Sequence, residues 1–161
     1  MYLDFTVYCI LVWDNTYKTH VDKILKLQKW ALRTISREHY RCHTDPLFIK
    51  HNILKVSDTF KLELGVFMYK HQTNSLPRIF CNYFTKNSQI YNYGTRNASG
   101  YSAHKRNKMF SDRAIRAAGP TLWNSLDNKF KIRKSSKHIR NMYKSNLIAC
   151  YSLLVFIFVS L

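Results

Sequence analysis

The sequence predicts a mainly α-helical protein: a small helical bundle with a short strand or loop region around residues 85–118 and a C-terminal helix. The chain holds only 4 Gly and 3 Pro in 161 residues, too few for the turns of a many-stranded sandwich or barrel. Its hydrophobic content of 46% is enough to bury a core, which excludes a wholly disordered basic chain. Apolar residues also recur at helical spacing in several segments.

The clearest predicted helix runs from Thr19 to Ser36. Its positions 21, 24, 25, 28, 31, 32 and 35 fall on one face, and Gln28 is the only polar residue among them. Thr19 and Asp22 have the spacing of a capping box, with Asp in place of the usual longer acid. We therefore expect this face, including Ile35, to lie on the core.

Two further helices follow. Asp45 and Pro46 suit a helix start, because Asp can cap the first turn and Pro lacks only an N–H that the first turn leaves unpaired. This short helix is expected to end near His51. The segment from Ser57 to His71 is apolar on two faces, which predicts a helix in the centre of the fold.

The second half is less regular. Residues 77–84 suit one more short helix, and residues 85–106 are polar and Asn- and Ser-rich, as in an extended connector. A strand is expected over 109–116, then a turn at Gly119-Pro120 and one or two helical turns over 121–127. A last helix begins at Ser135 or Ser136, with these residues facing inward: Ile139, Met142, Tyr143, Leu147 and Cys150.

The strongest functional indication is charge. The chain has 26 Lys and Arg against 9 Asp and Glu, a net charge of +17. Residues 101–144 alone carry 12 Lys and Arg against Asp112 and Asp127, a net charge of +10. Nucleic acids and acidic membrane surfaces are the common large anions, so one of these is the expected partner, although a basic protein that is merely soluble remains an alternative.

Two basic segments are candidates for binding nucleic-acid phosphates. Trp30 interrupts the first and is a candidate stacking group, together with Tyr91, Tyr93 and Tyr101. The alternative is an ordinary solvated face whose aromatic residue packs on a neighbour. The candidate cations are Lys26, Lys29, Arg33 and Arg37 in the first segment, and Lys105, Arg106, Lys108, Arg113 and Arg116 in the second.

Several short motifs occur in a characteristic order. They are the segments 8–17 (YCILVWDNTY), 27–35 (LQKWALRTI), 43–48 (HTDPLF), 62–70 (LELGVFMYK) and 119–126 (GPTLWNSL). Together they resemble the region downstream of the polymerase core in reverse transcriptases of non-LTR retrotransposons, of the LINE type and jockey- or CR1-like. The resemblance covers residues 2–151.

This resemblance implies a thumb-like domain that helps to hold template RNA and target DNA beside the polymerase core. The family's polymerase site is an Asp pair that binds two metal ions. The chain contains no Asp-Asp pair, so we expect a non-catalytic fragment, without cofactor and without catalytic or metal-binding residues. His39, Cys42 and His43 are potential zinc ligands, but no second ligand pair accompanies them. No motif supports a Cys42–His104 nucleophile pair.

The resemblance divides the chain into a helical thumb-like region over 1–84, a basic loop or strand region with the last helix over 85–151, and an apolar tail over 152–161. One alternative is a basic protein held at a membrane by residues 147–161. Another is a translated relic without a selected function. The four Cys are far apart and the apolar start lacks a basic segment, so we expect an intracellular protein without a signal peptide, in the nucleus or the cytoplasm.

Overall fold

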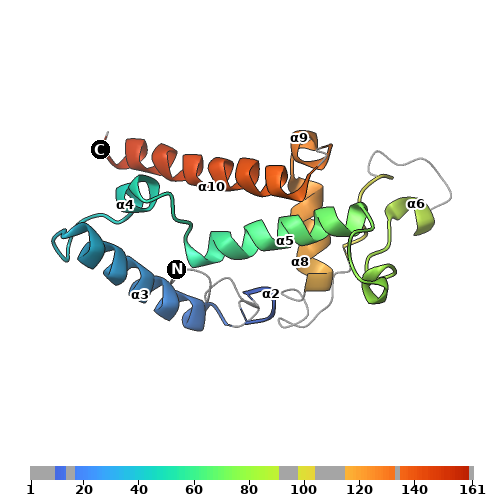
Figure 1. Ribbon diagram of the computed structural model, residues 1–161, viewed down its shortest axis with the longest axis horizontal. Coiled ribbons are helices and arrows are strands. Elements are labelled where there is room, and N and C mark those ends of the chain that lie inside the picture. The colour runs from blue at the N-terminus through green and yellow to red at the C-terminus, as the bar shows by residue number, and fades with distance from the viewer. Residues whose placement is uncertain (1–9, 14–16, 91–97, 104–114, 133–134, 160–161) are drawn as a thin grey trace. The chain divides into compact units, whose positions relative to one another are not determined.

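The computed structural model confirms a mainly helical protein (Figure 1). It describes residues 10–13, 17–90, 98–103, 115–132 and 135–159, without the side chains of 12–13 and 153–159. Within these residues the chain forms no strand, and only one antiparallel bridge joins Lys86 to Tyr101. The fold therefore rests on helix packing and on loops whose backbone groups need other partners.

The chain divides into two compact units. The first comprises residues 1–62 and 140–161, and the second comprises residues 63–139. Helices α5 (Val56–Gln72) and α10 (Ser136–Val159) each contribute residues to both units. In the first unit the remaining described helices are α2 (Ile10–Trp13), α3 (Lys18–Ser36) and α4 (Asp45–Lys50).

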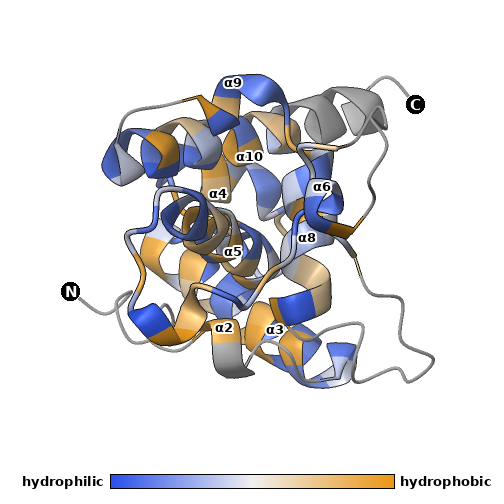
Figure 2. Cartoon of the chain, turned by 90° about the vertical axis from the view of Figure 1, so that its right-hand side faces the viewer, coloured by the Kyte–Doolittle hydropathy of each residue, from blue (hydrophilic) through white to orange (hydrophobic). Residues whose placement is uncertain are grey.

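Helix α3 confirms the clearest sequence prediction, and it carries both hydrophobic and hydrophilic residues (Figure 2). Val21 and Leu32 are buried on its inner face. Ile35, predicted to be inside, is 68% exposed, because the last turn of the helix is no longer covered. The predicted capping box is also wrong: the helix begins after Tyr17, whose carbonyl accepts the His20 and Val21 amides, and no side chain caps it.

Gln28 explains the one polar position on the inner face of α3. Its side-chain Nε2 donates to the Leu54 carbonyl at 2.7 Å, and its Oε1 accepts the Val56 amide at 3.2 Å. Val56 is the first residue of α5, where backbone N–H groups have no partner within the helix. The amide of Gln28 thus joins the middle of α3 to the segment that enters α5.

The other end of α3 is also anchored. Ser36 Oγ and His51 Nε2 lie 2.8 Å apart, which joins the end of α3 to the residue that follows α4, and the two helices are in contact. Asp45 was expected to cap α4, but no side chain does so. Asp45 is the first residue of the helix and Thr44 occupies the cap position, and the Asp45 carboxylate pairs with Lys55 at 2.9 Å.

A buried carboxylate holds α10 in the first unit. Asp58 accepts the Tyr151 hydroxyl at 2.6 Å through Oδ2 and the Lys61 ammonium at 2.8 Å through Oδ1. The same hydroxyl accepts the Lys55 amide at 3.2 Å. The ring of Tyr151 packs edge-on against Phe48, which is fully buried. Every polar group of this cluster is therefore paired, as burial requires.

The second unit is built on the C-terminal part of α5. It also contains a 3₁₀ turn, η1 (Arg78–Phe80), and helices α6 (Asn87–Ile90), α8 (Ile115–Ser125) and α9 (Asn128–Lys131). At its centre Gly119 of α8 approaches α5 closely, since a Cβ at this position would lie 2.8 Å from the Met68 sulfur. The buried core comprises Met68, Tyr69, Phe84, Tyr101, Trp123 and Ile139.

Several expectations for this region need correction. The helix expected over 77–84 is only the η1 turn. The turn expected at Gly119-Pro120 lies inside α8: Pro120 is the sixth of its eleven residues and is buried in the core. The strand expected over 109–116 ends in the first residues of α8, and its residues 109–114 lie outside the described part of the chain.

The Asn124 side chain binds the backbone of Tyr101 in the way that a neighbouring strand would. Its Oδ1 accepts the Tyr101 amide at 3.0 Å, and its Nδ2 donates to the Tyr101 carbonyl at 2.8 Å. The Asn87 amide donates to the Gly100 carbonyl, and the Ser102 amide donates to the Thr85 carbonyl. Side-chain and loop hydrogen bonds together hold residues 98–103 in place.

Helix α10 begins at Ser136, as predicted. Ile139 and Tyr143 are buried, and Met142 and Leu147 are half-buried, but Cys150 is exposed. Cys150 precedes the buried Tyr151, and its side chain leaves the helix at an angle of roughly 100° from that of Tyr151. Within the described part of the chain, no helix has the length and apolar character needed to cross a membrane.

We predict that Gln28→Leu destabilises the protein by about 1–3 kcal/mol, because the Leu54 carbonyl and the Val56 amide both lose their partner. Gln89→Leu is the matched control, since it removes one amide contact, to the Lys86 N–H, at an exposed site. Urea unfolding followed by circular dichroism measures both. Equal stability of Gln28→Leu and the unchanged protein would contradict the assigned role of Gln28.

We also predict that the free energy of unfolding falls as the pH rises above about 10, the ordinary tyrosine pKa. Burial, and secondarily the charge of Asp58, raises the pKa of Tyr143 to about 12, and burial followed by the Asp58 hydrogen bond raises the pKa of Tyr151. The unfolded chain therefore loses these protons first, which favours unfolding. Urea midpoints from about pH 8 to pH 11 should decrease, and less steeply for Tyr143→Phe. A constant midpoint would contradict the prediction.

Candidate nucleic-acid interface

Helix α3 presents the first group of candidate residues on one continuous side. Successive cations are three or four residues apart, so their backbone positions rise by about 5–6 Å per step and share a side of the helix. Lys26, Trp30 and Arg37 are exposed, whereas Lys29 and Arg33 are half-buried. The inner face of α3 is fixed by Val21, Leu32 and Gln28, so this side faces solvent.

The charge of this side is largely unneutralised. Residues 17–43 contain seven Lys and Arg against Asp22 and Glu38. Within the described residues, Lys26, Lys29, Arg33 and Arg37 form no ion pair; the pairs seen there include those of Lys55, Lys61 and Lys129. Like charges at this spacing repel one another, and a bound anion would relieve that repulsion.

Trp30 lies among these cations and is 66% exposed. Its side chain is therefore not a core residue, which weighs against the alternative that it packs on a neighbouring element. A large aromatic ring that remains in water beside cations has the composition of a stacking platform for unpaired bases. Leu27, one turn away, is also 65% exposed and adds apolar surface beside the ring.

The loop after α3 adds two residues that the sequence analysis missed. Tyr40 is 64% exposed, and the Arg41 guanidinium lies 5.1 Å from the centre of its ring. Arg33 Nε donates to the Cys42 carbonyl at 3.0 Å, which holds this loop against the last turns of α3. An exposed Tyr-Arg pair directly after a basic helix is visible in the sequence, but its exposure is not.

Arg37 gives this loop its direction. It ends α3 in the left-handed conformation, with φ of 54°, and its amide donates to the Thr34 carbonyl. The Glu38 amide then donates to the Arg33 carbonyl, as in a common helix ending. The chain therefore turns sharply, and the 39–42 segment remains beside the basic side of α3.

The second group of candidates is only partly within the described residues. Arg116 is exposed, and its guanidinium lies 5.4 Å from the centre of the Tyr83 ring. Tyr101 is 2% exposed, so the prediction that it stacks on bases is wrong. Hydrogen bonds from the Asn124 side chain of α8 to the Tyr101 backbone hold this residue in the core. The remaining candidates lie outside the described residues: Lys105, Arg106, Lys108, Arg113, Tyr91 and Tyr93.

His39, Cys42 and His43, the potential zinc ligands, do not form a metal site in the described residues. In the part of the chain that the structure describes, no three His, Cys, Asp or Glu side chains are placed to share a metal ion. Cys42 Sγ instead lies 3.5 Å from the His43 carbonyl, and the ring of His39 lies against that of Tyr40. His104 lies outside the described residues.

We predict that truncating the two described tryptophan side chains affects stability to very different degrees. Trp123→Ala should cost about 3–5 kcal/mol of stability, because the side chain is 4% exposed in the core of the second unit. Trp30→Ala should change stability by no more than about 0.5 kcal/mol, because its ring is in water. Thermal and urea unfolding measure both; a large loss on Trp30→Ala would place its ring in a core.

No protein-family model matches the chain. Neither a curated protein nor a solved structure matches it significantly. What the chain does is therefore inferred from its own residues, above all from the exposed side of α3 and the loop that follows it.

Proposed function

We propose that this protein binds single-stranded nucleic acid, through phosphate contacts from the basic side of α3 and base stacking on Trp30 and Tyr40. The observation that carries the proposal is the exposed ring of Trp30 among cations that have no ion-pair partner in the described residues. Phosphates neutralise the charge of the cations, and the flat faces of unpaired bases stack on the aromatic rings. A chain of 161 residues with a net charge of +17 supplies the long-range attraction.

A single strand suits this surface better than a duplex. In a duplex the bases stack on one another, and only their edges are accessible in the grooves. An exposed indole beside a row of cations offers a face to an unstacked base and charge to the adjoining phosphates. The contacts involve no base-edge recognition, so we expect little sequence preference.

We further propose that the chain is a non-catalytic piece of a non-LTR reverse transcriptase, in which this surface holds template RNA or target DNA beside the polymerase core. The ordered motifs of the sequence support this origin. The absence of an Asp-Asp pair from the sequence supports a binding role over a catalytic one.

The salt dependence of binding tests the phosphate contacts. Affinity for a single-stranded oligonucleotide should decrease steeply with salt, and Lys26→Gln/Arg37→Gln should lower the slope by about 1.4, which is 0.7 for each lost phosphate contact. Both residues are exposed, so the fold should tolerate the change. The matched control is Lys50→Gln, an exposed cation at the end of α4, which should leave the slope unchanged. Fluorescence anisotropy over a range of salt concentrations measures all three.

Trp30 gives a separate prediction within the same experiment. Trp30→Ala should weaken single-strand binding by about 1–3 kcal/mol and leave the salt slope unchanged, because stacking releases no counterions. Trp30→Phe should recover part of this loss, and duplex binding should change little. If the protein does not bind a single strand even at low salt, the proposed function is wrong.

A further inference from the structure

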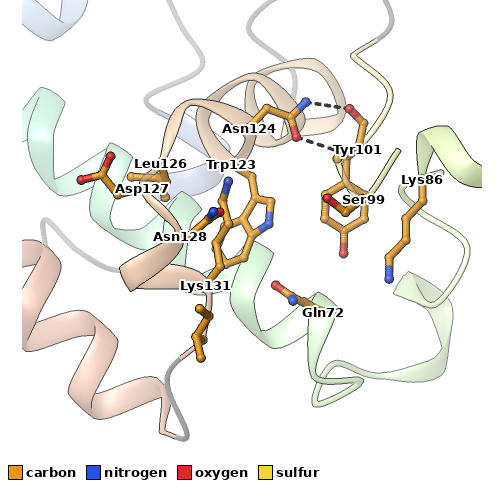
Figure 3. Close-up of a pocket in the computed structure, with 12 residues that line it drawn as sticks. Gln72, Lys86, Ser99, Tyr101, Trp123, Asn124, Leu126, Asp127, Asn128 and Lys131 are labelled. Carbon is orange, nitrogen blue, oxygen red and sulfur yellow. Dashed lines mark hydrogen bonds between the residues drawn. The ribbon is translucent and has the colours of Figure 1, made fainter. Parts of the chain in front are cut away.

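The second unit contains a surface hollow of about 610 Å³ that the sequence analysis did not anticipate (Figure 3). This volume lies within the roughly 300–1,000 Å³ typical of small-molecule sites. Buried residues form its floor, including Gly100, Tyr101 and Trp123, while polar and charged side chains form its rim. Tyr101 and Trp123 are only 2% and 4% exposed, so the polar rim, and not stacking on the floor, selects the ligand.

The rim is positively charged. Lys86 and Lys131 come from different elements, and Figure 3 shows them on either side of the Gln72 amide in that view. Neither ammonium forms an ion pair within the described residues. Asp127 is the only acid among the described lining residues, and Lys129 neutralises it at 3.0 Å. The hollow therefore has a net attraction for an anion.

The remaining rim groups are neutral amides. Gln72 and Asn128 line the hollow, and their side chains make no hydrogen bond within the described structure, so each offers both a donor and an acceptor. Asn124 differs, because both ends of its amide are bound to the Tyr101 backbone, which fixes the wall. A planar heterocycle with donors and acceptors on its edge would satisfy the two unbound amides.

We propose that this hollow binds a nucleoside monophosphate, either free or as an unpaired nucleotide of a strand. The phosphate lies between Lys86 and Lys131, where two ammonium groups can share its charge. The base lies in the hollow with its edge toward the unbound amides of Gln72 and Asn128. The site shares no residue with α3, so it can be present or absent independently of the function proposed above.

The test uses the full chain and four probes: adenosine monophosphate, adenosine, ribose phosphate and inorganic phosphate. Calorimetric titration should show adenosine monophosphate binding at least about tenfold more tightly than each of the other three, because only it uses both the cations and the rim amides. Equal binding of ribose phosphate would overturn the role of the base, and equal binding of adenosine would overturn the role of the cations. No binding of adenosine monophosphate would overturn the proposal.

Variants locate the binding. Lys86→Gln and Lys131→Gln should each weaken adenosine monophosphate binding by about tenfold, the loss expected for one charged hydrogen bond. Lys137→Gln is the matched control, because it removes an equal charge from an exposed position of α10 that does not line the hollow. Unchanged binding in both rim variants would overturn the site. Circular dichroism melting verifies that each variant is folded.

Fluorescence provides a second readout. The chain has 3 Trp, so Trp13→Phe/Trp30→Phe leaves Trp123 as the sole reporter, at the floor of the hollow. Adenosine monophosphate should change its emission with the affinity measured by calorimetry, and no change would overturn the placement. A short single strand that changes this emission, with the same dependence on Lys86 and Lys131, identifies the occupant as a nucleotide of a strand. A change with the free nucleotide alone identifies a small-molecule site.

Discussion

Loop backbone groups that leave water must find hydrogen-bond partners, and in this protein two side-chain amides provide them. Gln28 binds one carbonyl and one amide of the segment that enters α5. Asn124 binds both backbone groups of Tyr101. The described residues contain no strand to perform this task, so in each compact unit a side-chain amide contributes to it.

Both candidate binding surfaces depend on these amides. Gln28 fixes the rotation of α3, and this rotation places Trp30 and the cations in solvent. Asn124 fixes the segment that forms one wall of the hollow beside Trp123. In each unit, a buried polar contact thus determines which side chains face outward. The large positive charge adds to this arrangement, because anion binding to the folded chain offsets the repulsion among its cations.

The sequence predicted the bounds of the long helices more accurately than it predicted their capping contacts. The bounds of α3 and α5 follow from hydrophobic spacing, which reflects burial along a whole helix. Helix ends depend on single hydrogen bonds: Asp45 pairs with Lys55, ten residues away in sequence, and this pairing has no local pattern. The basic side of α3 was predicted from the same helical spacing as its buried face. The exposure of Tyr40 and the burial of Tyr101 were not, because neither has a local sequence pattern: Tyr101, for example, is held by Asn124, a residue of a different helix.

The most direct test of the account is to map the surface that contacts a single strand. Amide chemical shifts of the isotope-labelled protein, recorded while a short oligonucleotide is added, report every residue at once. The account predicts the largest changes on the exposed side of α3 and in residues 37–41, with small changes at the buried positions Val21 and Leu32. Changes confined to other segments, or a titration without changes on α3, would contradict it.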